Sequence, residues 1–311
     1  MEEKQFTKGW SRVKQSLLLL LILSFSASAS LRISSYNIRN YDKKSEQTDK
    51  AALKKIITNL NSDLIATEEI YNNNSFEQFA SKEFPGYGLS LSKCGGGGSQ
   101  NLGFMYKKDT LELENIIEDP KIADLGGITS YGCSSLRPAL LGFFKVKDSG
   151  LKFVAIVLHL KAGGGTRNYE KRERQYKYIL KMMRNLRVAG HKNIVVLGDL
   201  NTTGWNKSSA KSTDLDHLNF EDLLAKSGTR TITDNLKCTS YWSGPNRHDD
   251  IEIPSTLDHV LFSPDFMVMK LESAEVGSHC KAVNCVETYD SELGKSYSNV
   301  SDHCPITATF K

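Results

Sequence analysis

The chain lacks several features that would mark it for other protein classes. It has no Cys-x-x-Cys pair of the kind that holds structural zinc, no internal repeat, and no Pro- or Gly-rich linker dividing its 311 residues. Beyond the first thirty residues, no apolar run approaches the roughly 20 residues that a membrane-spanning helix needs. With 39% hydrophobic and 24% charged residues, the composition is typical of one soluble globular domain with a sizeable core.

The first 29 residues have the pattern of a secretory signal peptide. A basic start precedes the unbroken apolar run Leu17–Leu23, and Ala27-Ser28-Ala29 follows as a small-residue cleavage site. The alternative, a membrane anchor, would need a longer run. We therefore expect a signal peptide over residues 1–29 and a mature domain over residues 30–311. The mature protein is then secreted or periplasmic, without stable membrane association, and we expect a monomer.

Six cysteines are present, an even number that permits disulfides in an exported protein. Cys280 and Cys285 are close enough in sequence to close a small loop, and Cys94 with Cys133 is a second candidate pair. Cys304 lies inside an apparent core strand, where it is interpreted as a small buried apolar residue.

Short β-branched and apolar runs recur along the chain and predict strands. A helix with Leu53, Ile56, Ile57 and Leu60 on one face lies between the first two, and a basic helix lies before Ile194. This order favours one α/β domain in which two sheets pack together with helices outside. The predicted strands are Leu31–Tyr36, Asp63–Thr67, Leu102–Tyr106, Ala139–Val146, Phe153–Leu158, Ile194–Leu197, Leu257–Phe262 and Ile306–Phe310.

Polar side chains gather where these strands begin or end. In "NIVVLGDLNTTG", Asp199 and Asn201 follow a buried strand and share one face if the extended geometry continues; a turn is the alternative. The other strand ends contribute Asn37, Glu69, Arg137, His159, Lys161, Asp258, Asp302 and His303. Their shared position predicts a single site.

The composition of this predicted site indicates phosphoester hydrolysis. Carboxylate and amide oxygens suit Mg²⁺, with Mn²⁺ or Ca²⁺ as alternatives. Two histidines beside carboxylates can act as general base and general acid. Arg137 and Lys161 can bind a phosphate.

Seven motifs in order, Y-N-I-R, E-E-I, R-P-A, H-L-K, G-D-L-N, L-D-H-V and S-D-H-C-P, resemble the endonuclease/exonuclease/phosphatase superfamily, which includes deoxyribonuclease I. The resemblance covers about residues 31–311. It implies a four-layer α/β/β/α sandwich of two mixed sheets with outer helices. It also implies a divalent metal as cofactor.

The resemblance assigns roles residue by residue. It implies that Glu69 is the principal metal ligand, with Asn37 and Asp302 beside it. Asp199 and Asn201 match the pair that positions the attacking water and the phosphate. His303 matches the general base, Asp258 the carboxylate that orients a catalytic histidine, and His159 the second histidine, which assists the leaving oxygen or stabilises the transition state. Arg137 matches a phosphate-contacting arginine.

Some residues depart from the family pattern or lie outside it. Glu68 stands where the family usually has Gln, and Gln100 stands where deoxyribonuclease I has an acid. His259 is expected to point away from the site, because it neighbours Asp258 in the same strand. The remaining histidines are interpreted as surface residues: His191, His217, His248 and His279.

The substrate interpretation rests on the basic helix. From Arg167 to Lys192 there are nine Lys or Arg against two Glu, and the helix start follows His159 closely. Arg167, Lys171 and Arg172 are candidates to hold flanking phosphates, while a merely solvated face is the plainer interpretation. For the aromatic side chains of Tyr241 and Trp242 there are two interpretations. They stack on a base or sugar of the substrate, or they pack in the core.

We therefore expect an exported endonuclease that acts on DNA or RNA. One alternative is a secreted sphingomyelinase or phospholipase C-like phosphodiesterase, or a phosphatase, that uses the same residues. A less favoured alternative is a binding module without enzymatic activity.

Overall fold

The computed structural model describes residues 30–123, 135–203, 215–244, 249–268 and 270–311. The predicted signal peptide, Cys133 and His248 lie outside these residues. Among the helices of the described part, none combines the length and apolarity needed to cross a membrane.

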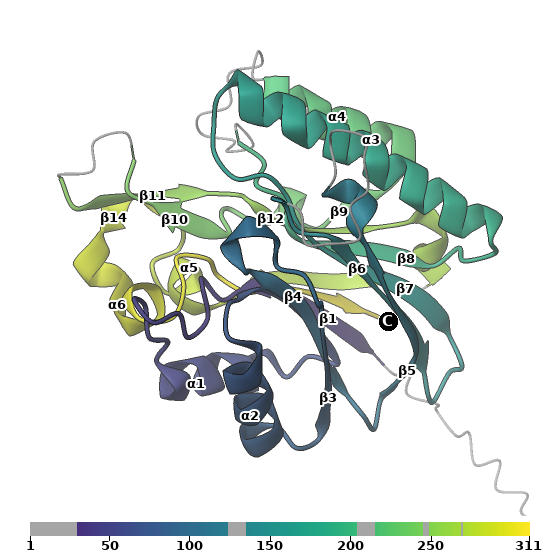
Figure 1. Cartoon of the computed structure of the whole chain (residues 1–311), viewed down its shortest axis with the longest axis horizontal. Helices are drawn as coiled ribbons and strands as arrows, with labels where there is room; N and C mark the ends of the chain where they lie inside the picture. Colours follow the sequence, from purple (N-terminus) through teal and green to yellow (C-terminus); the bar gives the residue numbers. More distant parts are fainter. Residues whose placement is uncertain (1–29, 124–134, 204–214, 245–248, 269) are drawn as a thin grey trace, which may run out of the picture.

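Two six-stranded sheets form the centre of the molecule (Figure 1). The first has the order β13 (Leu271–Val276), β15 (Ile306–Phe310), β1 (Leu31–Asn37), β2 (Leu64–Ile70), β4 (Asn101–Lys107) and β3 (Tyr87–Leu91). The second has the order β5 (Leu111–Asp119), β6 (Ala139–Val146), β7 (Lys152–His159), β8 (Ile194–Asp199), β12 (Asp258–Phe262) and β9 (Arg230–Thr231). Each sheet contains one parallel pair, β1 with β2 and β7 with β8, so both sheets are mixed.

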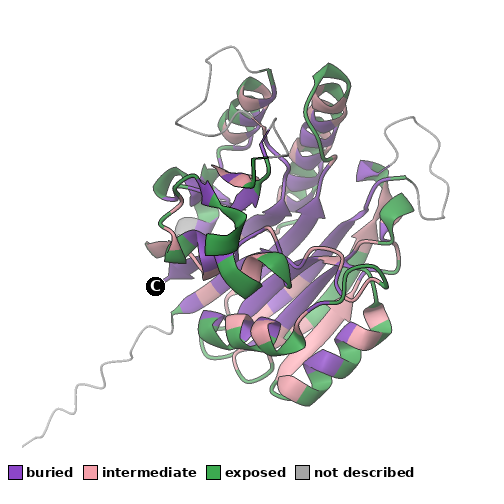
Figure 2. Ribbon diagram, turned by 90° about the vertical axis from the view of Figure 1, so that its left-hand side faces the viewer, coloured by how far each residue is buried: buried purple, intermediate pink, exposed green. Residues whose placement is uncertain are grey.

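Helices cover the outer faces of both sheets. Helices α1 (Lys50–Leu60) and α2 (Asn73–Glu83) pack on the first sheet, and α3 (Thr166–Val188) and α4 (Leu215–Ser227) pack on the second. Three apolar clusters separate the four layers, and the central one joins the two sheets through residues such as Phe104 and Phe144. Figure 2 shows this buried centre and the exposed outer sides of the helices. The predicted four-layer α/β/β/α sandwich is confirmed.

Local sequence explains where α1 begins and ends. The Asp49 carboxylate accepts hydrogen bonds from the amides of Ala51 and Ala52, which caps the first turn. Leu53, Ile57 and Leu60 are buried on one face, while Asn61 ends the helix in the left-handed conformation. The helical spacing read from the sequence therefore corresponds to the face that packs on the first sheet.

A third, smaller sheet projects beside the sandwich (Figure 1). It consists of β10 (Ser240–Trp242), β11 (Ile251–Ser255) and β14 (Thr288–Tyr289), followed by α6 (Asp290–Ser298), and α5 (Ser278–Ala282) lies nearby. Short 3₁₀ turns occur at Gly96–Gly98, Pro120–Ile122, Thr233–Asn235 and Pro264–Val268.

Two disulfides cross-link this smaller region, Cys238–Cys285 and Cys280–Cys304. The expected Cys280–Cys285 pair is wrong, and so is the interpretation of Cys304 as an unpaired residue. Cys94 is also disulfide-bonded, but its predicted partner Cys133 lies outside the described residues. Short sequence separation favoured the wrong pair, whereas the observed bridges join cysteines that are 47 and 24 residues apart.

Candidate functional site

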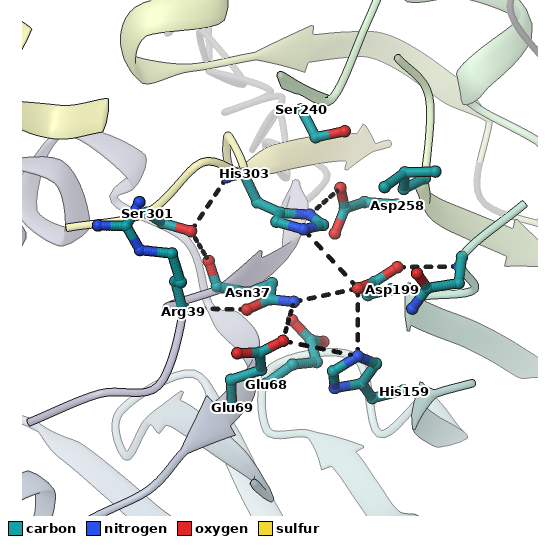
Figure 3. Close-up of polar contacts among 12 residues, drawn as sticks. Asn37, Arg39, Glu68, Glu69, His159, Asp199, Ser240, Asp258, Ser301 and His303 are labelled. Atoms are coloured by element: carbon teal, nitrogen blue, oxygen red, sulfur yellow. Dashed lines mark hydrogen bonds and ion pairs between the residues drawn. The ribbon is translucent and has the colours of Figure 1, made fainter. Parts of the chain in front are cut away.

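Strand register places three of the predicted residues in one row across the second sheet. His159 on β7 pairs in register with Asp199 on β8, and Asp199 pairs with Asp258 on β12. Gly198 makes the close approach of β7 and β8 possible, because a Cβ atom there would lie 2.0 Å from the Leu158 carbonyl oxygen. Figure 3 shows this row facing Asn37 and the two glutamates of the first sheet.

A bulge at the end of β2 separates the roles of Glu68 and Glu69. The β2–β4 register shifts between Thr67 and Ile70, and Glu69 adopts a left-handed φ of 60°. Glu69 then accepts hydrogen bonds from Asn37 Nδ2 at 3.3 Å and from the Asn40 amide at 3.0 Å. The bulge therefore directs the Glu69 carboxylate toward the opposite sheet.

Glu68 is fully buried behind Glu69 and accepts a hydrogen bond from Ser35 Oγ at 2.9 Å. Burial raises its pKa well above the ordinary value, and the Asp258 carboxylate raises it further. A neutral carboxylic acid has one donor and one acceptor in the same plane. Glu68 can thus occupy the place of the amide that the family usually has there.

His303 is held by a carboxylate. Its Nδ1 lies 2.8 Å from Asp258 Oδ2, and its Nε2 lies 3.8 Å from Asp199 Oδ2. Burial by itself would lower the pKa of His303, but the Asp258 and Asp199 carboxylates raise it well above the ordinary value. His303 Nδ1 is therefore fixed by Asp258, and Nε2 is directed into the site.

His159 lacks a comparable partner. Its Nε2 lies 3.3 Å from Asp199 Oδ2 and 3.7 Å from Glu69 Oε1, while Nδ1 is buried without a hydrogen-bond partner in the described part of the chain. Burial lowers the pKa of His159 well below the ordinary value, and the Arg137 charge lowers it further. The imidazole is therefore neutral, and it donates one hydrogen bond through Nε2.

The chain turns immediately after Asp199. Asn201 has a φ of 51°, and its amide donates to Asp199 Oδ1 at 2.9 Å, so the turn alternative is the one observed. The Asn201 side chain donates to the Leu160 carbonyl at 3.4 Å. Burial raises the pKa of Asp199 to about 7, and the His303 charge opposes this increase. The two side chains are adjacent because of this turn and not because of strand alternation.

The donor set fits a divalent cation. One ligand atom from each of Glu69, His159 and Asp199 lies within 4.8 Å of the others. Asp199 is buried and Glu69 is half-buried, and loss of solvation raises the pKa of both carboxylates, so a bound cation would relieve an electrostatic cost. Carboxylate oxygens suit Mg²⁺, Mn²⁺ or Ca²⁺.

The other two predicted metal ligands are placed differently. Asn37 directs Nδ2 at Glu69 and Asp199, while its Oδ1 accepts the Arg39 amide at 3.0 Å. In this orientation Asn37 is a donor that holds two carboxylates together, not an oxygen ligand. Asp302 lies outside the clusters of ligand atoms among the described residues, although its charge raises the pKa of Glu69 and His303.

The predicted phosphate-binding cations also fall into different environments. Arg137 is buried, and its guanidinium donates to the carbonyls of His159 and Leu160 and to Gln100 Oε1. It therefore supports the end of β7 instead of presenting its full edge to a substrate. Lys161 is partly exposed and donates to the Ala162 carbonyl, and Arg167 is exposed in the first turn of α3.

Arg172 was also a candidate to hold a flanking phosphate. It is fully buried, so that expectation is wrong. It forms a bidentate pair with Asp216 at 2.9 and 3.0 Å and donates to the carbonyls of Lys161 and Gly163. Its position on the buried face of α3, four residues before Tyr176, was the available signal. Arg172 thus fixes the loop that follows His159.

Ser301 was not assigned a role from the sequence. Its Oγ donates to the Asn37 carbonyl at 2.7 Å and accepts the His303 amide at 3.0 Å. It therefore joins the strand that carries Asn37 to the segment that carries His303 (Figure 3). Its presence in the S-D-H motif was the only sequence signal.

The remaining predictions have mixed outcomes. His259 points away from the site, where it contacts Thr202 and Thr233, as expected. His279 is buried, so its interpretation as a surface residue is wrong, while His191 and His217 are partly exposed. Tyr241 packs in the core, whereas Trp242 is 48% exposed.

Comparisons with known proteins identify the family of the chain. The sequence profile of the Endonuclease/Exonuclease/phosphatase family matches residues 34–303. No curated protein sequence matches the chain.

Solved structures share the fold at low sequence identity. An endonuclease/exonuclease/phosphatase from Bacteroides vulgatus is 18% identical, with a TM-score of 0.62, over 91% of this chain and 99% of its own. The mannosyl-6-phosphatase Bt3783 of Bacteroides thetaiotaomicron is 17% identical, with a TM-score of 0.62, over 90% of this chain and 99% of its own. D. rerio TDP2, solved with a single-strand DNA product, is 16% identical, with a TM-score of 0.62, over 91% of this chain and 99% of its own. The chain belongs to the endonuclease/exonuclease/phosphatase family, whose members are hydrolases that act on phosphoester bonds.

Proposed function

We propose that the chain is an exported, divalent-metal-dependent phosphodiesterase that cleaves DNA or RNA internally. The observation that carries this proposal is the position of Asp199 between two histidines of opposite character, 3.3 Å from His159 Nε2 and 3.8 Å from His303 Nε2. A phosphoester placed here meets a proton acceptor on one side and a neutral hydrogen-bond donor on the other.

In the proposed mechanism, His303 removes a proton from the attacking water. Asp258 holds His303 Nδ1, so the proton is accepted at Nε2, which points toward Asp199. Asp199 and the Asn201 turn orient the water and the phosphate. His159 donates its Nε2–H to the charge that develops on the phosphoryl or leaving oxygen.

Glu69 and Asp199 are the residues that would hold the metal, because His159 Nε2 carries a proton and has no lone pair to offer. A divalent cation there would supply Lewis-acid stabilisation of a phosphoryl oxygen. Asn37 and the Asn40 amide orient the Glu69 carboxylate for this task.

A nucleic-acid substrate is supported by exposed charge beside the site. Arg167 lies in the first turn of α3, and Lys161 lies in the segment between His159 and that turn. Such cations bind phosphates without reading sequence. D. rerio TDP2, which shares the fold, has been solved in complex with a single-strand DNA product, and this supports a nucleic-acid substrate.

Export, a monomeric state and the absence of stable membrane association complete the proposal. Export rests on the signal-like pattern of residues 1–29, and the absence of stable membrane association rests on the lack of a second long apolar run. Disulfides in the described chain agree with an oxidising compartment.

The proposal is tested by incubating residues 30–311 with supercoiled plasmid and Mg²⁺, with Mn²⁺ and Ca²⁺ in parallel. We expect nicking that is abolished by EDTA and strongly reduced in His159→Ala and His303→Ala. Intact plasmid from folded protein with all three metals would overturn the nuclease assignment. Turnover of a choline-phosphate lipid or a sugar phosphate at the same site would then select the lipid phosphodiesterase or phosphatase alternative.

A further inference from the structure

Register in the small sheet places four apolar side chains on one face. Trp242 on β10 pairs with Ile253 on β11, and Ile251 pairs with Tyr289 on β14. Residues directly opposite each other, and residues two apart in one strand, point to the same side of a sheet. Trp242, Ile253, Ile251 and Tyr289 therefore form one stripe, which we call the aromatic face.

The aromatic face is open to solvent, and the opposite face is not. Trp242 is 48% exposed and Tyr289 is 56% exposed, with the two isoleucines partly exposed between them. On the other side of the same strands, Tyr241, Glu252 and Thr288 are buried. Exposed Trp and Tyr side by side with Ile are uncommon on a surface that contacts only water.

The sheet that carries this face is continuous with the candidate site. Ser240, at the start of β10, forms a β-bridge with His303. The Tyr241 amide also donates to the Asp302 carbonyl at 2.9 Å. Trp242 is two residues beyond Ser240, or ~7 Å along the strand, and Ile251 lies a similar step further out. The aromatic face thus begins about one residue pair from His303 and leads away from it.

The small sheet is also held in place by covalent bonds. Cys238 precedes β10 and is joined to Cys285, while Cys280 is joined to Cys304, the residue after His303. A platform fixed in this way keeps its position relative to the catalytic histidine.

Charge around the aromatic face indicates which part of a substrate it contacts. Exposed acids flank it, namely Asp249, Asp250, Glu287 and Asp290, whereas exposed basic residues lie at the start of α3. Figure 1 shows that the start of α3 is well separated from strands β10 and β11. Acidic neighbours disfavour phosphates and anionic bilayers but tolerate uncharged rings.

We propose that the aromatic face is a stacking platform for the bases next to the scissile phosphate of a single-stranded nucleic acid. This inference rests on the proposed function and adds that the site prefers single-stranded over double-stranded nucleic acid. The flanking phosphates contact the start of α3, while the bases lie on Trp242 and Tyr289. A duplex is disfavoured because its bases are already stacked and its second backbone would approach the acidic rim.

The test compares two oligonucleotides of equal length, oligo-dT and an abasic chain that has the same phosphates and no bases. Cleavage is measured for the wild type, Trp242→Ala, Tyr289→Ala and the conservative variant Trp242→Phe. Ile117→Ala is the matched control, because Ile117 is 44% exposed on β5, at the edge of the second sheet.

We expect Trp242→Ala to raise KM for oligo-dT by about tenfold, with little change in kcat, and to leave the abasic chain unaffected. Tyr289→Ala should have a smaller effect, and Trp242→Phe should restore most of the affinity. Equal effects on both oligonucleotides, or no effect on either, would overturn the platform. Trp242-dependent binding to phosphatidylcholine vesicles without an effect on oligo-dT would overturn it in favour of a lipid surface.

Binding is also measured without turnover, by fluorescence anisotropy of labelled oligo-dT with His303→Ala. This separates the platform from the proposed function. If the wild type cleaves no nucleic acid but binding still depends on Trp242, the nuclease assignment fails and the platform stands. If cleavage occurs and Trp242 is immaterial to binding, the platform fails and the nuclease assignment stands.

Discussion

The two histidines of the candidate site lie in environments that shift their pKa values in opposite directions. His303, beside β12, has a carboxylate 2.8 Å from Nδ1, and its pKa is raised well above the ordinary value. His159, at the end of β7, has a buried Nδ1 without a partner in the described residues, and its pKa is lowered well below the ordinary value. Both imidazoles are buried and both approach the same Asp199 oxygen.

The comparison shows that burial alone does not decide the charge of a histidine. Desolvation disfavours the charged form on both sides, but at His303 the Asp258 and Asp199 carboxylates outweigh it. His303 can therefore take up and release a proton, while the neutral His159 can donate only a hydrogen bond.

The largest expected effect comes from removing the proton acceptor. His303→Ala should reduce phosphodiester cleavage by about 10³-fold, or ~4 kcal/mol, because general-base catalysis contributes about that much. Cleavage of plasmid DNA under single-turnover conditions measures it. A loss of less than about tenfold in folded protein would contradict the role of His303.

The buried His279 should make folding sensitive to acid. Burial lowers the pKa of His279 to about 4, below its ordinary 6.5, so the unfolded chain binds a proton that the folded chain excludes. Its contribution is complete above pH 6.5 and is lost as the pH falls toward 4. The loss should amount to about 3 kcal/mol of unfolding free energy.

Urea unfolding of the wild type and His279→Gln at pH 7 and pH 4.5 measures this contribution. The variant should lose less stability on acidification than the wild type, and His217→Gln, at a partly exposed position, should match the wild type. Equal pH dependence in the wild type and His279→Gln would show that burial does not control His279.

The difference in pKa between His303 and His159 should shrink when the Asp258 carboxylate is removed. Asp258→Asn should lower cleavage by about 10²-fold, because the imidazole loses its orienting partner. The acidic limb of the pH–rate profile should also move to lower pH, since Asp258 raises the pKa of His303. An unmoved acidic limb would exclude His303 as the group that titrates there.

The smallest effect is expected on the His159 side. A glutamine can replace a neutral imidazole that donates one hydrogen bond, so His159→Gln should cost only about tenfold in kcat, or ~1.4 kcal/mol. His159→Ala should cost distinctly more. Steady-state cleavage of an oligonucleotide compares the two variants, and equal losses would mean that His159 does more than donate through Nε2.

Much of the sandwich was predictable because its central strands are buried on both faces. All eight predicted strands are observed, with ends within a few residues of the predicted ones. The missing strands lie mainly at sheet edges and in the small sheet, such as β5 and β11, where exposed and charged residues interrupt the apolar pattern.

The site was predicted as a set of residues more accurately than as a set of contacts. His159, Asp199 and Asp258 meet because strand ends in neighbouring strands align. Asn37 and Arg137 lie in the site as well, but their amide and guanidinium groups are directed to protein carboxylates and carbonyls. Side-chain direction depends on neighbours that a single strand end does not reveal.

The sequence by itself determined the family, the layered architecture and the chemical composition of the site. These follow from local patterns, because apolar periodicity and short motifs are written in consecutive residues. Tertiary structure alone decided the cysteine pairing, the burial of Arg172 and His279, and the opposite states of His159 and His303. Each of these depends on groups brought together from distant segments, whose electric fields and contacts exist only after the chain has folded.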